Sequence, residues 1–455
     1  MATDVTLSAS QLLSPLLTDY PNAQRWVVAY SGGVDSLVLL HLCHTFLAQQ
    51  SVQALPELCA VHINHGLQAP ALQWAQQCQQ QAQAWSVRLH VEAVSINKQP
   101  RQSLEDQARQ ARYQVFEKLL QPGDLLLQGH HSNDQAETLL LRLLRGSGSQ
   151  GLGAMPAARP LAAGVLVRPL LAVSRSDIEA YAQQQQLQWI EDPSNQSSDY
   201  DRNFLRLELL PKLAQRWPQV LESFSRSARL SAESYQLNQE LAAIDAQALA
   251  DEAADAYGAG LAIAGLKKLT AARGKNLLRY WLAQQQLAMP SEAQLLAVMA
   301  TVINAQADAS PTVSWPGVEV CRYEGRLYAH APLPDFTAGS QCRWDLRSAI
   351  TLAGAGALSV KSCTDGALRL PAGVSAADVT IRFRQGGEQC RPAGRGGSRK
   401  LKKLLQELAV PYWLRQRVPL IYCGDERIAG ADRVVAEGWQ AAAGEPGWQI
   451  QWQRP

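Results

Sequence analysis

Residues 31–36 read Ser-Gly-Gly-Val-Asp-Ser and have the residue types of an anion-binding loop. Two adjacent glycines allow positive φ and let successive backbone N–H groups point at one anion. No lysine closes the stretch, so it differs from a Walker loop, whose Gly-Lys-Ser/Thr ending reaches the outer phosphates. Asp35 lies inside the loop, and a carboxylate beside phosphate suits an intervening Mg²⁺. The stretch therefore predicts a polyphosphate site with metal at Asp35; a glycine-rich turn without ligand is the alternative.

A second polar stretch, His-His-Ser-Asn-Asp-Gln-Ala-Glu-Thr, occupies residues 130–138, at a predicted transition from strand to helix. Asn133 or Asp134 is expected to cap that helix, since both residue types are favoured at this position. The functional interpretation is that the His131 imidazole and the Asp134 carboxylate reach the same rim as Asp35. Capping alone is the simpler alternative.

Two further pairs of residues are candidates for the same site. His62 and His65 follow a predicted strand, but two histidines without a third ligand are weak support for zinc, so we expect nucleotide contact or a structural role. Arg109 and Arg112 lie three residues apart and hence on neighbouring positions of one helix face. Such arginines are commonly solvated ion-pair formers. Facing a phosphate, they would instead neutralise a leaving pyrophosphate or hold an RNA phosphate.

The elements that must position these residues alternate between strand and helix over residues 25–175. Short apolar, β-branched runs predict strands at 26–30, 57–63, 87–94, 124–128 and 165–167. Helical periodicity covers 37–46, 72–85, 104–120 and 135–145. This alternation is typical of a parallel sheet with crossover helices. Because ligands lie outside the carboxyl ends of such strands, we expect the polar stretches to converge on one rim.

The chain of 455 residues is too long for one ordinary core, and its length predicts two or three domains. A helical region rich in Ala, Gln and Leu follows a boundary near residue 215, and a hairpin is predicted at 311–330. Short apolar runs separated by glycine turns then predict a small β-rich domain. The predicted domains are 1–215, 216–335 and 365–455. The glycine-rich segment 145–156 has too many glycines for a helix, and we interpret it as a linker or a mobile flap.

Basic residues concentrate in one part of the chain. Residues 382–417 hold ten Lys and Arg against two Glu, although the net charge of the chain is only +2. This local charge suggests a polyanionic partner larger than a nucleotide. Gly394 to Gly397 would let the backbone approach phosphate, and Tyr412 and Trp413 offer stacking surfaces. A solvated basic face is the alternative.

The cysteines and the apolar runs exclude several classes of protein. Eight cysteines are scattered without a CxxC pair, which argues against a disulfide framework, a zinc ribbon or an iron–sulfur site. Nothing resembles a signal peptide, and no apolar run approaches the roughly 18 residues of a membrane helix. We expect a cytoplasmic protein with no membrane partner.

Ser-Gly-Gly-Val-Asp-Ser resembles the signature of the N-type ATP pyrophosphatases, the PP-loop superfamily, which split ATP between the α and β phosphates. Further blocks resemble the tRNA(Ile)-lysidine synthetase family, in its order and over most of the chain: HINHGL, EDQARQARY, HHSNDQAETLLLRLLRGSGSQGL, VRPLL, WIEDPSNQSSDYDRNFLR and RKLKKLLQELAVPYWLR. The resemblance implies an α/β fold with a Rossmann-like PP-loop domain of the adenine nucleotide alpha hydrolase type. A mainly helical substrate-recognition domain and a small β-rich α+β tRNA-binding domain would follow.

The resemblance also implies the reaction, with ATP and Mg²⁺ as cofactors. ATP adenylates the C2 carbonyl oxygen of the wobble cytidine in an isoleucine tRNA with a CAU anticodon. The ε-amine of free L-lysine then displaces AMP and gives lysidine. That amine must be neutral to attack, whereas a free lysine side chain has a pKa of about 10.4. We expect Asp134 or His131 to take the proton.

Each matching position receives a role from the resemblance. Pyrophosphate and Mg²⁺ are held by Ser31, Gly32, Gly33, Val34, Asp35 and Ser36, and His62 contacts the nucleotide. The catalytic candidates are Asp35, Arg112, His131 and Asp134, with Arg112 and Asp134 as the favoured pair. The predicted tRNA contacts are Arg206, Arg399, Lys400, Lys402 and Lys403. Asn133 stands where an acid is common in the family.

Two alternative functions are compatible with the same residues. Another PP-loop tRNA-modifying enzyme, such as a thiolase, usually carries paired cysteines, which are missing here. A non-catalytic, ATP-sensing RNA-binding protein would bind ATP and tRNA without releasing pyrophosphate. A homodimer is consistent with the sequence.

Overall fold

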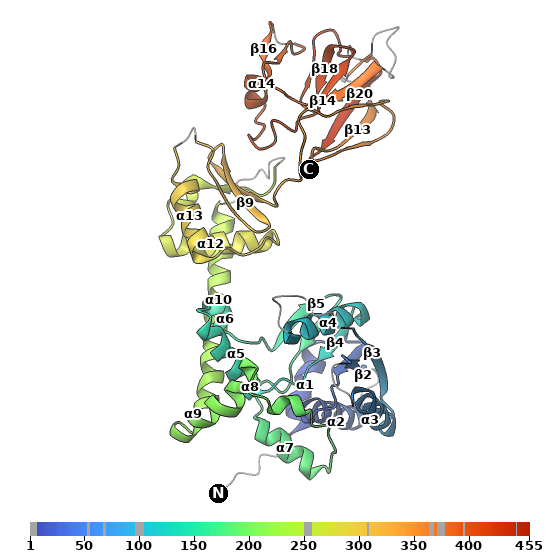
Figure 1. Ribbon diagram of the computed structural model, residues 1–455, viewed down its shortest axis with the longest axis vertical. Helices are drawn as coiled ribbons and strands as arrows, with labels where there is room; N and C mark the ends of the chain where they lie inside the picture. The colour runs from blue at the N-terminus through green and yellow to red at the C-terminus, as the bar shows by residue number, and fades with distance from the viewer. Residues whose placement is uncertain are drawn as a thin grey trace. The chain divides into compact units, whose positions relative to one another are not determined.

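The computed structural model divides into two compact units, Met1–Asn238 and Gln239–Pro455 (Figure 1). It describes residues 7–51, 55–66, 70–95, 104–249, 257–306, 309–363, 368–370, 378–394, 396–442 and 444–455. The domain boundaries expected near residues 215 and 335 stay predictions, and residue 365, the expected start of the last domain, lies outside the described residues.

A six-stranded sheet with the order β3-β2-β1-β4-β6-β5 forms the centre of the first unit. Its strands are β1 (Arg25–Ala29), β2 (Glu57–Asn64), β3 (Arg88–Ala93), β4 (Asp124–Leu127), β5 (Ala158–Leu161) and β6 (Gly164–Val167). All pair in parallel except β5, which runs antiparallel to β6. The order reverses between β1 and β4, and such a switch point opens a crevice at the carboxyl ends of the strands. The predicted parallel sheet is therefore confirmed, whereas β5 was not predicted.

Helices cover both faces of this sheet (Figure 1). One face packs against α1 (Ala9–Asp19), α2 (Val34–Ala48), α3 (Ala71–Ala84) and α7 (Arg175–Gln184). The other face packs against α4 (Leu104–Leu119). The alternation of β1 shows why: Trp26 and Val28 belong to the core under α2, and Val27 to the core under α4. Because α2 is buried along most of its length, the loop at its N-terminus is held rigidly.

Two helices, α5 (Ser132–Leu144) and α6 (Ser149–Leu152), connect β4 to β5. After β6 and α7 the chain stays helical through the 3₁₀ turn η1 (Pro193–Gln196), α8 (Asp201–Phe204), the π-helix η2 (Leu205–Leu209), α9 (Leu210–Arg216) and α10 (Val220–Leu249), and the boundary between the two units falls within α10. The expectation that residues 145–156 form no helix was wrong, because α6 lies within them. A single helical turn tolerates Gly151, since glycine costs only about 1 kcal/mol relative to alanine.

The second unit has two separate apolar cores. The first contains α11 (Ile263–Leu266), α12 (Ala271–Gln284), α13 (Glu292–Ala297), the π-helix η3 (Val298–Ile303), and the sheet of β7 (Leu261–Ala262), β8 (Thr312–Trp315), β9 (Val318–Tyr323) and β10 (Arg326–His330). β9 and β10 confirm the predicted hairpin.

The second core is β-rich, as predicted. A five-stranded sheet contains β11 (Gln341–Arg343), β14 (Val379–Arg382), β17 (Leu420–Cys423), β18 (Glu426–Gly430) and β19 (Val434–Val435). A three-stranded sheet contains β12 (Ile350–Leu352), β13 (Gly356–Cys363) and β20 (Gly447–Gln453). β15 (Gln389–Cys390) and β16 (Arg399–Lys400) form a ribbon that leads into α14 (Leu401–Glu407). Of the helices in the described part of the chain, none is long and apolar enough to cross a membrane.

Candidate active site

The loop after β1 is built as an open anion cradle. Gly32 has φ +91°, and a Cβ there would lie 2.6 Å from Ile190 Cδ1, so glycine is required for both conformation and space. The Ser36 hydroxyl accepts from the Ser31 N–H at 3.1 Å and donates to the Gly33 carbonyl at 3.0 Å. Gly33 is the N-cap of α2 and has no side chain to occupy the first N–H groups of that helix. These N–H groups and the helix dipole favour an anion at this point.

The loop after β4 brings the second polar stretch to the same place. His131, not Asn133 or Asp134, is the N-cap of α5, which corrects the sequence-based expectation. Asp134 takes the third helical position, and its Oδ2 accepts a hydrogen bond from the His131 N–H at 3.0 Å, as in a capping box. Asn133 Oδ1 instead accepts from the Arg175 N–H at 3.1 Å, so this amide joins the starts of α5 and α7.

His131 connects the two loops. Its Nε2 lies 3.6 Å from Asp35 Oδ1 and 3.4 Å from Asp134 Oδ2, and the side chain is 2% exposed. Asp35 Oδ2 pairs with Arg175 Nη1 at 3.2 Å. Asp35 Oδ1 is buried and accepts no hydrogen bond from any described residue. The predicted convergence of Asp35, His131 and Asp134 is thus what the fold produces.

A buried ion-pair network of Glu137, Arg202 and Arg206 lies next to Asp134 and holds its carboxylate. Glu137 is fully buried, and its carboxylate accepts from Arg202 Nε at 2.7 Å and from Arg206 Nε at 2.7 Å. Arg206 Nη2 also lies 3.4 Å from Asp134 Oδ1. Arg206 belongs to the π-helix η2, a type of helical turn that often occurs at functional sites. Arg206 therefore lies in the wall of the site, where its predicted contact with tRNA stays a prediction.

The two carboxylates of the site have opposite protonation tendencies. Burial raises the pKa of Asp35, and the positive charges of His131 and Arg175 do not compensate for it. Burial also acts to raise the pKa of Asp134, but His131 and Arg202 outweigh it and lower that pKa. Asp134 is therefore held ionised, whereas Asp35 has too little positive charge around it to offset its burial.

A cavity of about 710 Å³ opens in front of these groups. The predicted site residues in its lining are Ser31, Asp35, Ser36, His62, Arg112, Asp134 and Arg206. His62 is buried, its Nδ1 lies 2.9 Å from the Tyr30 carbonyl oxygen, and burial lowers its pKa. Val34 is buried in the first turn of α2, so only its backbone is available to a ligand. Arg112 and Asp134 therefore share a cavity, as expected for the favoured pair.

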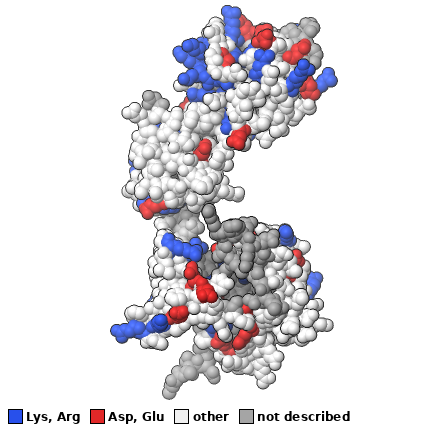
Figure 2. Space-filling view, viewed as in Figure 1, with Lys and Arg blue, Asp and Glu red and all other residues white. Residues whose placement is uncertain are grey.

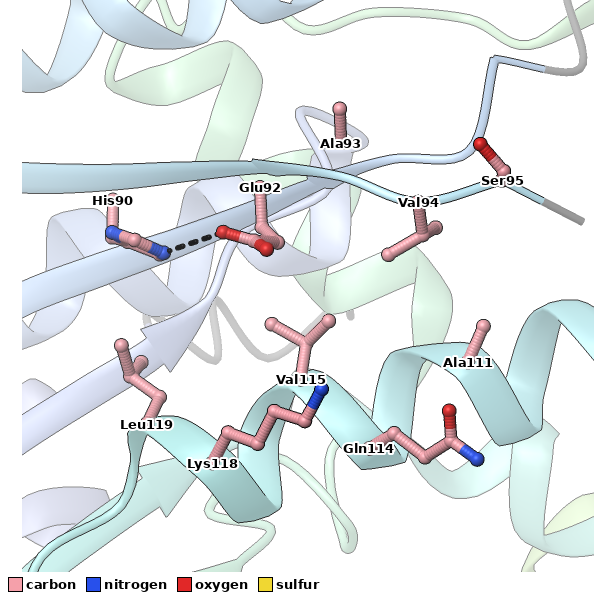
Figure 3. Close-up of a pocket in the computed structure, with 10 residues that line it drawn as sticks. All are labelled: His90, Glu92, Ala93, Val94, Ser95, Ala111, Gln114, Val115, Lys118 and Leu119. Atoms are coloured by element: carbon pink, nitrogen blue, oxygen red, sulfur yellow. Dashed lines mark hydrogen bonds and ion pairs between the residues drawn. The ribbon is translucent and has the colours of Figure 1, made fainter.

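A second cavity, of about 460 Å³, lies between β3 and α4 (Figure 3). The His90 imidazole points at the Glu92 carboxylate there, with 3.1 Å between Nε2 and Oε2, and Lys118 extends from α4. None of the predicted site residues lines it. The cavity at the carboxyl ends of β1 and β4 is the candidate active site, because it alone of the two contains the anion cradle and the paired carboxylates.

The predicted tRNA contacts of the tail lie on β16 and α14. Figure 2 shows Lys and Arg side chains gathered over this part of the chain. Lys400, Lys402 and Lys403, here called the tail lysines, are exposed, while Arg399 pairs with Glu407 at 3.0 Å. Arg395, within the predicted basic stretch, lies outside the described residues.

The aromatic residues predicted to stack on RNA are placed differently from the expectation. Trp413 packs against Tyr328 and His330, with ring centroids 5.8 and 5.6 Å apart, and Tyr412 Oη lies 2.8 Å from Thr312 Oγ1. Both rings are therefore engaged inside the second unit.

Sequence reasoning did not assign Glu137, Arg175 or Arg202 to the site. Glu137 and Arg202 occur within stretches that were noticed, but their pairing joins residues 65 positions apart. Arg175 had no signal of its own, since it lies at the start of an ordinary helix. All eight cysteines are described, and all are free in the structure.

The fold, the glycine loop and its position at the switch point define a PP-loop protein. Residues 1–213 match the family model of the PP-loop domain, 261–328 that of the TilS substrate binding domain, and 379–452 that of the TilS substrate C-terminal domain. The tRNA(Ile)-lysidine synthase of Coxiella burnetii is 39% identical over 443 residues, covering 97% of this chain and 96% of the relative. That of Serratia proteamaculans is 42% identical over 451 residues, covering 98% and 100%. The chain therefore belongs to the tRNA(Ile)-lysidine synthase family.

Among solved structures, the U34-tRNA thiolase NcsA of Methanococcus maripaludis matches part of this chain. It is 16% identical with a TM-score of 0.41, and the match covers 50% of this chain and 78% of that chain.

Proposed function

We propose that the chain ligates free L-lysine to C2 of the wobble cytidine in the CAU anticodon of isoleucine tRNA. ATP activates the C2 oxygen as an adenylate with release of pyrophosphate, and lysine then displaces AMP. Family membership over nearly the whole chain supports this reaction. The observation that carries it is the meeting of the anion cradle with Asp35 and Asp134 at one cavity, with the buried His131 imidazole between the two carboxylates. We place the reaction in the cytoplasm, where tRNA, ATP and free lysine occur together.

The cradle binds the leaving pyrophosphate. The first backbone N–H groups of α2, those of Val34, Asp35 and Ser36, supply donors that cost no reorganisation at the moment of reaction. Gly32 and Gly33 let the chain turn into that helix without a side chain over the donors, and Ser31 and Ser36 line the cavity. Arg112, exposed on α4 at the cavity, adds positive charge where negative charge develops. His62, held against the Tyr30 carbonyl, contacts the nucleotide.

Asp35 is the residue that would hold Mg²⁺. Its buried Oδ1 lacks a hydrogen-bond partner among the described residues, and burial raises the pKa of the carboxyl group. A divalent cation bound at this oxygen would supply the positive charge that the surroundings of Asp35 do not provide. Across the described ranges, no group of three or more His, Cys, Asp or Glu side chains is placed to hold a metal. The single carboxylate of Asp35 suits Mg²⁺, which uses one or two carboxylates and takes other ligands from phosphate and water. The bound ion would neutralise charge on the β and γ phosphates.

Asp134 and His131 prepare the lysine for attack. The ε-ammonium loses a proton to one of these two groups, whose Nε2 and Oδ2 lie 3.4 Å apart. The neutral nitrogen bonds to C2, and the C2–O bond breaks so that AMP leaves with that oxygen. The low pKa of Asp134 keeps a negative charge beside the ammonium. Arg202 and Arg206 fix the carboxylate in place. Arg206, Arg399 and the tail lysines are the proposed contacts to tRNA.

The alternative functions are not favoured. The relatives named above are tRNA(Ile)-lysidine synthases, and among the described residues the cysteines form no metal-binding group. A thiolase or a non-catalytic RNA-binding protein therefore has no observation in its support.

Nucleoside analysis of isoleucine tRNA after incubation with ATP and lysine tests the proposal. We expect the wobble cytidine to be replaced by a nucleoside heavier by one lysine less one water. An unchanged cytidine would refute the function. Within the mechanism, D134A supplied with pre-adenylated tRNA should transfer lysine much more slowly than the parent. Transfer at the parent rate would exclude Asp134 as part of the base.

A further inference from the structure

Three arginines converge on Tyr113 beside the reaction cavity. The Arg109 and Arg159 guanidinium carbons lie 5.3 and 5.2 Å from the centroid of the Tyr113 ring. Arg168, at the end of β6, donates from Nε to His130 Nδ1 at 3.2 Å and from Nη1 to the Pro156 carbonyl at 2.6 Å. We call Arg109, Tyr113, Arg159 and Arg168 the Tyr113 cluster. They come from α4, β5 and β6, so the fold alone brings them together.

The charge of this cluster is not neutralised. Within the described residues, no carboxylate lies within ion-pair distance of Arg109, Arg159 or Arg168, whereas Arg202 and Arg206 are both paired with Glu137. Arg168 is only 4% exposed. Removing a cation from water without a counter-charge is strongly unfavourable. An anion bound at the cluster would therefore offset its uncompensated positive charge.

The titration of the cluster agrees with this geometry. Burial lowers the pKa of Arg168, and the neighbouring charges of Arg159 and Arg109 lower it further. Burial acts to raise the pKa of Tyr113, yet the three arginines outweigh it and lower that pKa. The phenol oxygen of Tyr113 is buried, and the Arg159 and Arg168 guanidinium groups act on it as hydrogen-bond donors. Among the described residues no acceptor faces its O–H, which is therefore left to donate to a ligand. Guanidinium groups and an unused hydroxyl donor are the groups that bind phosphate.

The position of the cluster identifies which anion it takes. His130, which accepts from Arg168, lines the reaction cavity, as do Ala108 and Arg112 on the same helix as Arg109 and Tyr113. The phosphates of ATP already have the cradle at the start of α2, which is built from other residues of the cavity lining. Arg109 is exposed and Arg159 is half-buried, so the cluster is accessible from solvent. An RNA strand that passes over the protein surface could therefore reach it.

We propose that the Tyr113 cluster binds a backbone phosphate of the RNA strand that presents its base to the reaction cavity. The inference rests on the proposed function, since it names how the substrate RNA of that site is held. Arg109 and Arg159 make the outer contacts, Tyr113 donates a hydrogen bond, and Arg168 supplies buried positive charge. Nothing in the cluster reads a base, so its contribution is to position the strand.

The test compares R109A/R159A with the control double variant R226A/R229A, which removes two exposed arginines of α10 and changes the net charge equally. Arg168 is left intact because it also holds the Pro156 carbonyl. Binding of unmodified isoleucine tRNA is measured over a series of KCl concentrations, with ATP affinity and the KM for lysine measured alongside. Y113F, which keeps the ring and removes the hydroxyl, is the second variant.

We expect R109A/R159A to bind tRNA about tenfold more weakly, with a salt slope lower by about 0.7–0.9 for each phosphate that the variant no longer neutralises. ATP affinity and the KM for lysine should not change, and Y113F should weaken tRNA binding in the same direction. An unchanged salt slope, an equal weakening in the control variant, or a raised KM for lysine with intact tRNA binding would each overturn the proposal. The binding comparison does not require lysine transfer, so a parent protein that binds tRNA but transfers no lysine would refute the proposed function separately.

Discussion

Glu137 provides the sharpest test of how the site is held. The carboxylate is fully buried, and it accepts three charge-assisted hydrogen bonds, one from Arg202 Nε at 2.7 Å and two from Arg206 at 2.7 and 2.9 Å. Glu137→Ala would leave the Arg202 and Arg206 guanidinium groups with only Asp134 as a counter-charge, at 3.6 and 3.4 Å from its Oδ1. Breaking a buried pair in this way costs about 3–5 kcal/mol. For a folded unit of 150–250 residues, that destabilisation lowers Tm by about 6–20 °C.

The control for this substitution is Glu233→Ala. Glu233 pairs with Arg229 at 2.6 Å on the surface of α10, with both side chains more than half exposed. An exposed pair four residues apart on a helix contributes only about 0.3–0.5 kcal/mol. Glu137→Gln keeps the volume without the charge and should fall between the two.

Hydrogen exchange of peptides from α5 and η2 is the appropriate assay, because a chain of several domains does not unfold in one two-state transition. We expect E137A to lose protection in both elements, while E233A keeps it. If E137A were destabilised by no more than about 1 kcal/mol, the assignment of this network as the support of Asp134 would be wrong.

The remaining predictions concern the charge of Asp35 in the candidate active site and the charges of the tail lysines. Because burial raises the pKa of Asp35, the unfolded chain ionises this group at lower pH than the folded chain, and stability is lost as pH rises through the raised pKa. Asp35→Asn should therefore be as stable as the parent in acid and more stable than the parent at pH 7.5, and MgATP should not stabilise the variant. Thermal unfolding at both pH values checks this, and a variant less stable than the parent at pH 7.5 would contradict it. Replacing all tail lysines by Ala should weaken tRNA binding and flatten its salt dependence with ATP affinity unchanged. An unchanged salt slope would show that the tail lysines touch no phosphate.

The sheet and its rim could be predicted because their signals are local. β-branched runs alternate with helical periodicity, so the strands of the parallel sheet were found, and the rule for carboxyl ends then placed Asp35 beside His131 and Asp134. β5 was missed because it is a short edge strand with a proline, whose pairing with β6 is antiparallel and carries no helix crossover.

The support of the site could not be predicted, because its partners are distant in sequence. The pairing of Glu137 with Arg206 depends on the π-helix η2 and on the packing of that segment beside α5. The role of His131 as N-cap depends on an imidazole in a position that usually prefers Ser, Thr, Asp or Asn. Trp413 looked like an exposed stacking surface because the hairpin of β9 and β10, against which it packs, lies about 90 positions earlier.

The most direct test of the central claim is transfer of labelled lysine to an unmodified isoleucine tRNA transcript with a CAU anticodon, with AMP and pyrophosphate counted in the same reaction. The predicted result is incorporation only when ATP is present, with one AMP and one pyrophosphate released for each lysine. Pyrophosphate release without lysine incorporation would keep the PP-loop chemistry and contradict lysine as the substrate. Binding of tRNA with no pyrophosphate release would contradict catalysis altogether.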